Sequence, residues 1–102
     1  MNPRFGLCEL DIERLCAVFR EHPEIRRVLM YGSRAKGNYK RGSDIDIAIV
    51  GNMDDRTLSQ VATELDDLLL PYQIDIAAYE GIQTPELKSH IDRVGQTLYE
   101  RH

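Results

Sequence analysis

Two aspartates at alternate positions, Asp44 and Asp46, begin an apolar stretch that ends at Val50. Alternate side chains of an extended strand point to the same face, so these carboxylates share one face and the intervening isoleucines share the other. Like charges held close together raise a carboxyl pKa or recruit a cation, and carboxylate oxygens are ligands suited to Mg²⁺. Two such ions would clamp the attacking and leaving oxygens of a displacement at phosphorus. The pair therefore predicts a divalent-metal site for nucleotide chemistry.

The residues before this pair are typical of a phosphate-binding turn. Gly32 has no side chain to block a close approach of the backbone, and Ser33 offers a hydroxyl group and a main-chain N–H. Residues 25–43 include six basic side chains and no acid, whereas the rest of the chain has 7 basic and 17 acidic residues. We therefore expect the ligand of this turn to be an anion.

A third carboxylate occurs in a second alternating stretch, residues 73–77. In this stretch Ile74 and Ile76 face one way and Asp75 faces the other. If the stretch pairs beside the strand that begins near Asp44, the three aspartates meet on one polar face of a sheet. Such a carboxylate would complete a metal site and help to take the proton from an attacking hydroxyl group.

Together these features resemble the DNA polymerase beta-type nucleotidyltransferase superfamily and, within it, the minimal nucleotidyltransferases. The resemblance covers about residues 26–77, half of the chain. It implies an α/β (α+β) fold in which a small mixed β-sheet has one face covered by helices. The matching residues are Gly32-Ser33, a spacer of ten residues, Asp44-x-Asp46 and the later Asp75.

The resemblance also implies the roles of individual residues. It assigns two roles to Asp44, Asp46 and Asp75, which are the catalytic residues and also the ligands of two Mg²⁺ ions. The residues that bind ATP, the nucleotide substrate, are Gly32, Ser33, Arg34, Lys36 and Ser43. Lysine keeps the positive charge of the arginine that related sequences often have at such a position, but it lacks the planar fork of arginine.

The activity implied by the family is the transfer of AMP from ATP to a hydroxyl group, with release of pyrophosphate. Minimal nucleotidyltransferases resemble the antitoxin halves of two-gene modules whose other half is an all-helical HEPN ribonuclease toxin. We therefore expect a tyrosine of such a toxin, bound in a hetero-oligomer, to be the acceptor. Two alternatives remain, namely an antitoxin that occludes its toxin without chemistry and a transferase that modifies an antibiotic. The intact carboxylates favour chemistry.

Length and composition restrict the remaining functions. With 102 residues we expect one domain, residues 1–102, and no separate substrate-recognition domain. The formal net charge of -4 argues against direct nucleic-acid binding, which needs a broad basic surface. The sequence shows no signal-peptide pattern and no membrane-spanning apolar run, and Cys8 and Cys16 lack zinc or disulfide spacing. We expect a cytoplasmic protein with two buried free thiols and no membrane partner.

The apolar periodicity predicts the elements that position the site. Helical spacing predicts a covering helix that ends by Pro23, a second helix over about 55–70 that packs on the isoleucine face, and a short helix over 85–94 capped by Thr84. Alternation predicts strands at about 26–31, 44–50 and 73–79.

The histidines and tyrosines show no spacing that connects them with the site. His22 comes at the end of a predicted helix and His90 lies within a short one. Tyr31 and the other four tyrosines follow no pattern. We expect structural or solvent-facing roles for all of them.

Overall fold

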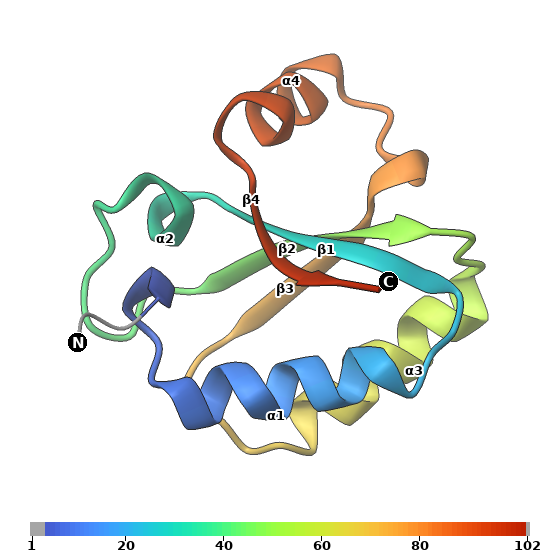
Figure 1. Ribbon diagram of the computed structural model, residues 1–102. Coiled ribbons are helices and arrows are strands. Elements are labelled where there is room, and N and C mark those ends of the chain that lie inside the picture. Colours follow the sequence, from blue (N-terminus) through green and yellow to red (C-terminus); the bar gives the residue numbers. More distant parts are fainter. Residues whose placement is uncertain (1–3, 102) are drawn as a thin grey trace.

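The computed structural model describes residues 4–101. Four strands form one mixed sheet in the order β3-β2-β1-β4, with helices on both sides (Figure 1). The strands are β1 (Ile25–Tyr31), β2 (Ile45–Gly51), β3 (Ile74–Ala78) and β4 (Gln96–Glu100). The helices are α1 (Glu9–Arg20), α2 (Ser33–Lys36), α3 (Asp55–Asp66) and α4 (Pro85–Val94), together with the 3₁₀ turns η1 (Arg4–Gly6) and η2 (Tyr79–Gly81).

The strand pairing decides which side chains meet on each face. β2 is parallel to β3, whereas β1 is antiparallel to both of its neighbours, β2 and β4. The register places Tyr31 opposite Asp46, and Asp46 opposite Asp75. Because directly opposite residues point to the same side of a sheet, these three side chains share a face.

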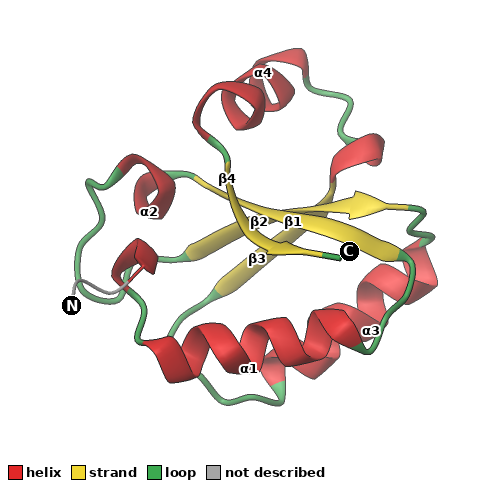
Figure 2. Cartoon of the chain, viewed as in Figure 1, coloured by secondary structure: helices red, strands yellow, loops and turns green. Residues whose placement is uncertain are grey.

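The other face is packed against α1 and α3, which lie together on one side of the sheet (Figure 2). The isoleucines of β2 on this face, Ile45, Ile47 and Ile49, are fully buried. They belong to one apolar cluster with Leu15 of α1 and Val61 of α3. The prediction that the second helix packs on the isoleucine face is therefore confirmed.

The face that carries the aspartates is covered only in part, by α4 on the opposite side from α1 and α3 (Figure 2). A small apolar cluster of Leu29, Ala48 and Ile91 holds α4 against the sheet. The sequence predicted helices on one face, and the structure adds this shorter helix on the other. Its bounds agree with the predicted 85–94 segment, although the Thr84 side chain makes no capping hydrogen bond.

The second predicted helix ends four residues earlier than expected, at Asp66. Leu68 N–H and Leu69 N–H donate to carbonyl oxygens three residues back, which tightens the chain into a turn. Leu69 then adopts a left-handed backbone with φ of 56° and is 87% exposed. Leu69 lies within the predicted range 55–70, and its exposure follows from this left-handed helix end.

The cysteines differ from the expectation of two buried thiols. Cys8 is exposed and Cys16 is half-buried, and both are free thiols. The Cys16 thiol donates a hydrogen bond to the carbonyl oxygen of Leu98 at 3.7 Å, which links α1 to the edge strand β4. Across residues 4–101, none of the helices has the length and apolar character to cross a membrane.

Candidate active site

Three side chains form a row across three neighbouring strands. Asp75 on β3, Asp46 on β2 and Tyr31 on β1 are directly opposite one another in the register. Asp75 is exposed at the edge of the sheet, whereas Asp46 and Tyr31 are partly buried. We call these three residues the carboxylate row. Their arrangement agrees with the predicted convergence of Asp46 and Asp75 on one face.

Asp44 lies just before β2 and is exposed. Its charge is close enough to raise the pKa of Asp46. Within the range 4–101, no three His, Cys, Asp or Glu side chains are already gathered in a geometry that could hold a metal ion. The structure therefore brings Asp46 and Asp75 together and leaves Asp44 beside them, without forming a closed three-carboxylate cage.

The electrostatics of the row match a site that recruits a cation. Burial raises the pKa of Asp46, and so do the charges of Asp75 and Asp44 and a side-chain hydrogen bond with Asp75, while the charge of His90 lowers it. A divalent cation bound between these carboxylates would relieve this repulsion. The donor set consists of hard carboxylate oxygens, which is the ligand chemistry that Mg²⁺ prefers.

The glycine turn lies directly against the row. Gly32 follows Tyr31 and has a left-handed backbone, with φ of 74° and ψ of -155°. A Cβ atom placed on Gly32 would lie 2.5 Å from Asp46 Oδ2, closer than atoms pack, so a side chain here would collide with the carboxylate. Ser33 begins α2 and is partly exposed. The predicted phosphate turn and the carboxylates are therefore neighbours in space.

Arg34, a predicted nucleotide contact, donates all of its hydrogen bonds that the structure shows to carbonyl oxygens of the protein. Its guanidinium group is buried, with only 3% of the residue exposed. Two of its nitrogens donate to the carbonyl oxygen of Ser43, at 3.1 and 2.8 Å, and the third donates to the carbonyl oxygen of Phe5 at 2.9 Å. The rings of Tyr39 and Tyr72 lie 5.5 and 4.9 Å from the guanidinium carbon. Arg34 therefore holds the loop together, and a nucleotide contact for it stays a prediction.

The two remaining predicted nucleotide residues lie on the same loop. Ser43 Oγ accepts a hydrogen bond from the main-chain N–H of Lys40 at 2.8 Å, so this hydroxyl closes a turn just before Asp44. Lys36 ends α2 and is exposed. A nucleotide contact for Lys36 or Ser43 stays a prediction.

His90 and Tyr31 are site residues that the sequence did not reveal. The Tyr31 ring meets the His90 ring edge-on, with 6.2 Å between the ring centroids. Burial raises the pKa of the Tyr31 hydroxyl, and so do the charges of Asp46 and Asp75, so the hydroxyl stays protonated at neutral pH. Tyr31 comes directly before Gly32 and two residues after Leu29, so both side chains point to the same face of the strand. This alternation is the sequence signal that could have identified Tyr31. His90 is brought to the site by the packing of α4 on the sheet, and the spacing of residues in the sequence does not reveal such a tertiary contact.

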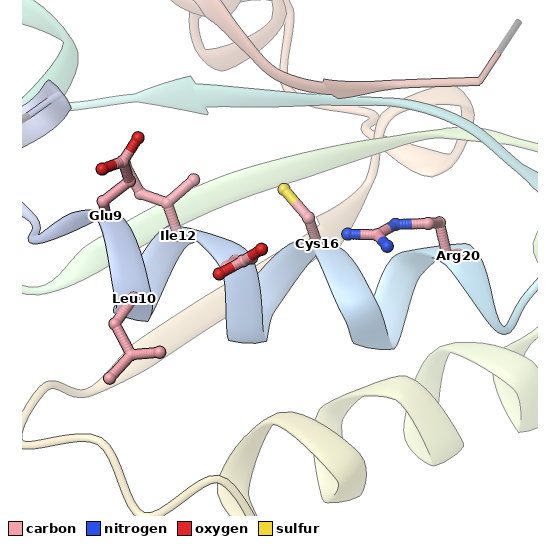
Figure 3. A pocket seen from close by; sticks show the side chains of 6 residues that line it. Glu9, Leu10, Ile12, Cys16 and Arg20 are labelled. Atoms are coloured by element: carbon pink, nitrogen blue, oxygen red, sulfur yellow. The ribbon is translucent and has the colours of Figure 1, made fainter.

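A separate groove of about 590 Å³ runs along α1 (Figure 3). It is lined by Glu9, Leu10, Ile12, Glu13, Cys16 and Arg20. None of these residues belongs to the carboxylate row, and α1 lies on the opposite face of the sheet. This groove is therefore no part of the site.

Solved structures with the same fold come from toxin-antitoxin complexes. A chain of a toxin-antitoxin crystal structure with AMP-PNP superposes with a TM-score of 0.72 at 21% identity, covering 89% of this chain and 74% of that chain. A complex of tri-AMPylated Shewanella oneidensis HEPN toxin with MNT antitoxin gives a TM-score of 0.68 at 19% identity, covering 91% and 72%. At these identities the likeness shows a shared fold.

The sequence comparisons agree with this fold. A curated protein of Methanocaldococcus jannaschii, named "putative protein adenylyltransferase", is 41% identical over 54 residues. The aligned stretch is 53% of this chain and 51% of that relative, so the chain matches about half of the relative's length. Residues 13–102 match the family described as polymerase beta, nucleotidyltransferase. Because this match spans most of the sequence, the chain belongs to the polymerase beta nucleotidyltransferase family.

Proposed function

We propose that this chain transfers AMP from ATP to a hydroxyl group of a HEPN toxin and acts as the antitoxin of that pair. The observation that carries the proposal is the pairing of Asp46 with Asp75 directly beside the Gly32 turn. The family membership supports nucleotidyl transfer. The name of the M. jannaschii relative supports a protein as the acceptor, and the AMPylated toxin complex supports a HEPN partner.

The nucleotide binds at the turn in this proposal. The main chain at Gly32 lies beside Asp46 because no Cβ separates them, so a triphosphate held here is within reach of the carboxylates. Ser33 contributes its hydroxyl group and its main-chain N–H to the β- and γ-phosphates. Exposed Lys36 adds a positive charge at the end of α2.

The carboxylates hold the metal in this proposal. Asp44, Asp46 and Asp75 offer only oxygen ligands, which suits two Mg²⁺ ions, and exposed Asp44, just before β2, would turn toward the pair when the metal binds. Bound Mg²⁺ supplies positive charge that neutralises the phosphates and the departing pyrophosphate.

The acceptor enters from the β3 edge. Asp75 is exposed and lies on the outermost strand, so a side chain of another protein can reach it. Asp75 accepts the proton of the acceptor hydroxyl, which we take to be a tyrosine. The acceptor oxygen forms a bond to the α-phosphorus, the bond from that phosphorus to the oxygen bridging the β-phosphate breaks, and pyrophosphate leaves.

The proposal is tested by incubating the purified chain with its HEPN partner, Mg²⁺ and α-labelled ATP. We expect label on the toxin, with release of pyrophosphate and loss of its ribonuclease activity. Asp46→Asn and Asp75→Asn should each lower the rate of labelling at least about a hundredfold, because each removes a metal ligand or base. Asp66→Asn on α3 removes a distant exposed carboxylate and should leave the rate unchanged.

Other results would point to the alternatives. If the Asp46→Asn, Asp75→Asn double variant inhibits the toxin as well as the wild-type chain does, and no label appears, inhibition works by occlusion. Label on an aminoglycoside but on no protein would instead identify an antibiotic-modifying enzyme.

A further inference from the structure

The wall of the carboxylate row on the α4 side is formed by an imidazole. His90 is partly exposed and its ring lies edge-on to Tyr31, the last member of the row. Its charge reaches Asp46, the central member, and opposes the effects that raise the pKa of that carboxyl. His90 therefore faces the same space as the carboxylates, although it comes from a helix and they come from strands.

The position of His90 is fixed by its neighbours in sequence. Ile91 is buried in the small apolar cluster under α4. Asp92 accepts a hydrogen bond from the Tyr79 hydroxyl at 2.6 Å, which ties α4 to η2 at the end of β3. These two anchors hold the turn of α4 that carries His90, and the imidazole packs edge-on against the Tyr31 ring, close enough to Asp46 for its charge to act on that carboxyl. A group held in this way is prepared to bind a ligand with little loss of side-chain entropy.

We propose that His90 is a catalytic residue of this site, which donates a hydrogen bond to a non-bridging oxygen of the α-phosphate of ATP, and that Tyr31 is the positioning residue that orients it. This inference rests on the proposed function, and it adds the contact that selects the phosphate to be transferred. The turn at Gly32 and Ser33 would bind the two outer phosphates, so the α-phosphate is the one left above Asp46.

The need for such a donor follows from the charges in and beside the row. Asp46, Asp75 and Asp44 all repel an anionic phosphate, and Arg34, the buried cation of the loop, is occupied by carbonyl oxygens. A donor aimed at a non-bridging oxygen of the phosphoryl group under transfer, where negative charge rearranges, stabilises the transition state more than the bound substrate. An imidazole N–H serves this purpose in either of its uncharged tautomers.

The test measures binding of α,β-methylene-ATP, which cannot be cleaved, and of pyrophosphate, both with Mg²⁺ and by calorimetry. His90→Ala should weaken binding of the ATP analogue about tenfold to a hundredfold, because a hydrogen bond to a charged oxygen is lost. Binding of pyrophosphate, which has no α-phosphate, should stay within about twofold by the same argument. His90→Gln keeps an N–H donor and should recover a large part of the loss.

The transfer reaction gives a second readout. In labelling assays His90→Ala should lower kcat on the order of a hundredfold, with a smaller rise in KM for ATP. Tyr31→Ala should resemble His90→Ala, and Tyr31→Phe, which keeps the ring that orients His90, should recover most of that loss. Ser89→Ala, an exposed neighbour on α4, is the matched control for folding.

The outcomes separate this inference from the proposed function. Equal weakening of the analogue and of pyrophosphate by His90→Ala, or no weakening of either, would overturn the role of His90. If the analogue shows the expected pattern but no label reaches the toxin, the acceptor is wrong and the role of His90 stands. If label reaches the toxin at the wild-type rate with His90→Ala, the proposed function stands and this inference falls.

Discussion

The two faces of the sheet are built from alternate residues of the same strands, yet they bury different kinds of side chain. On β2, Ile47 points into the sealed layer beneath α1 and α3, whereas Asp46 and Ala48 point to the partly covered side beneath α4. A shift of one residue in the register would exchange the two sets. The apolar face therefore fixes the register, and the register in turn brings Asp46 opposite Asp75. The packing that stabilises the apolar face therefore also positions the carboxylates on the other face.

The same substitution on each face should reveal this difference most clearly. Ile47→Ala should destabilise the protein by about 2 to 5 kcal/mol, because it leaves a cavity in a fully buried layer. Ile82→Ala, which packs against the cluster of Leu29, Ala48 and Ile91, should cost only about 1 kcal/mol, because that side chain is partly exposed before the change. Chemical denaturation of both variants measures the two free energies of unfolding. Equal losses would show that α4 seals its face as completely as α1 and α3 seal theirs.

The loop between the two site strands should respond to a change at Arg34. Arg34→Lys keeps the charge, but one ammonium group cannot satisfy the carbonyl oxygens of both Ser43 and Phe5, which the guanidinium bridges. We expect a loss of about 1.5 to 3 kcal/mol in stability, the usual worth of a hydrogen bond to a charged group. Lys36→Arg, on the exposed side of the same short helix, is the matched control.

The effect on nucleotide binding tests whether Arg34 only holds the loop or also contacts the nucleotide. A residue that only holds the loop should weaken pyrophosphate and α,β-methylene-ATP by the same factor when it is changed. If the change weakens the binding of only one of the two ligands, Arg34 contacts the nucleotide.

Those parts of the fold with strong local periodicity could be predicted from the sequence. The strand at 44–50 was predicted because its isoleucines and aspartates alternate, and the same phasing predicted that Asp46 and Asp75 meet. The strand β4 was missed because only Leu98 of its five residues is buried, so its alternation is too weak to detect. A short edge strand owes its structure to the neighbour that it pairs with.

The site residues divide in the same way. The shared face of the carboxylates could be predicted, because it depends only on their alternate positions along each strand, and these are visible in the sequence. Arg34 and His90 depend on contacts with distant segments, since Arg34 binds Phe5, 29 residues away, and His90 meets Tyr31 across the α4 interface. Residue type alone predicted a phosphate contact for Arg34 and no contact for His90. In the structure Arg34 donates to the carbonyl oxygens of Ser43 and Phe5, and His90 lies against Tyr31, and both arrangements depend on tertiary packing.

The smallest expected effect concerns one carboxyl group on each face of the sheet, whose contributions to stability should change with pH in opposite directions. On the packed side, Glu64 of α3 lies 2.8 Å from His22, which follows α1, and this hydrogen bond lowers the pKa of Glu64. On the site side, burial and like charges raise the pKa of Asp46. A lowered carboxyl pKa adds stability that is present at neutral pH and is lost on acidification, whereas a raised one subtracts stability at neutral pH and is relieved on acidification.

The two carboxyls should therefore give opposite results when each is made neutral. At pH 7 we expect Glu64→Gln to lower the free energy of unfolding and Asp46→Asn to raise it, because the first removes a favourable ionised group and the second an unfavourable one. At about pH 3, below the ordinary pKa of aspartate, the Asp46 difference should be almost gone, whereas the Glu64 difference should shrink and vanish only once the pH is below the lowered pKa of Glu64. Denaturant unfolding at the two pH values measures this. A fall in stability with Asp46→Asn at pH 7 would mean that the carboxylate row is already neutralised, and the case for a recruited cation would lose its electrostatic basis.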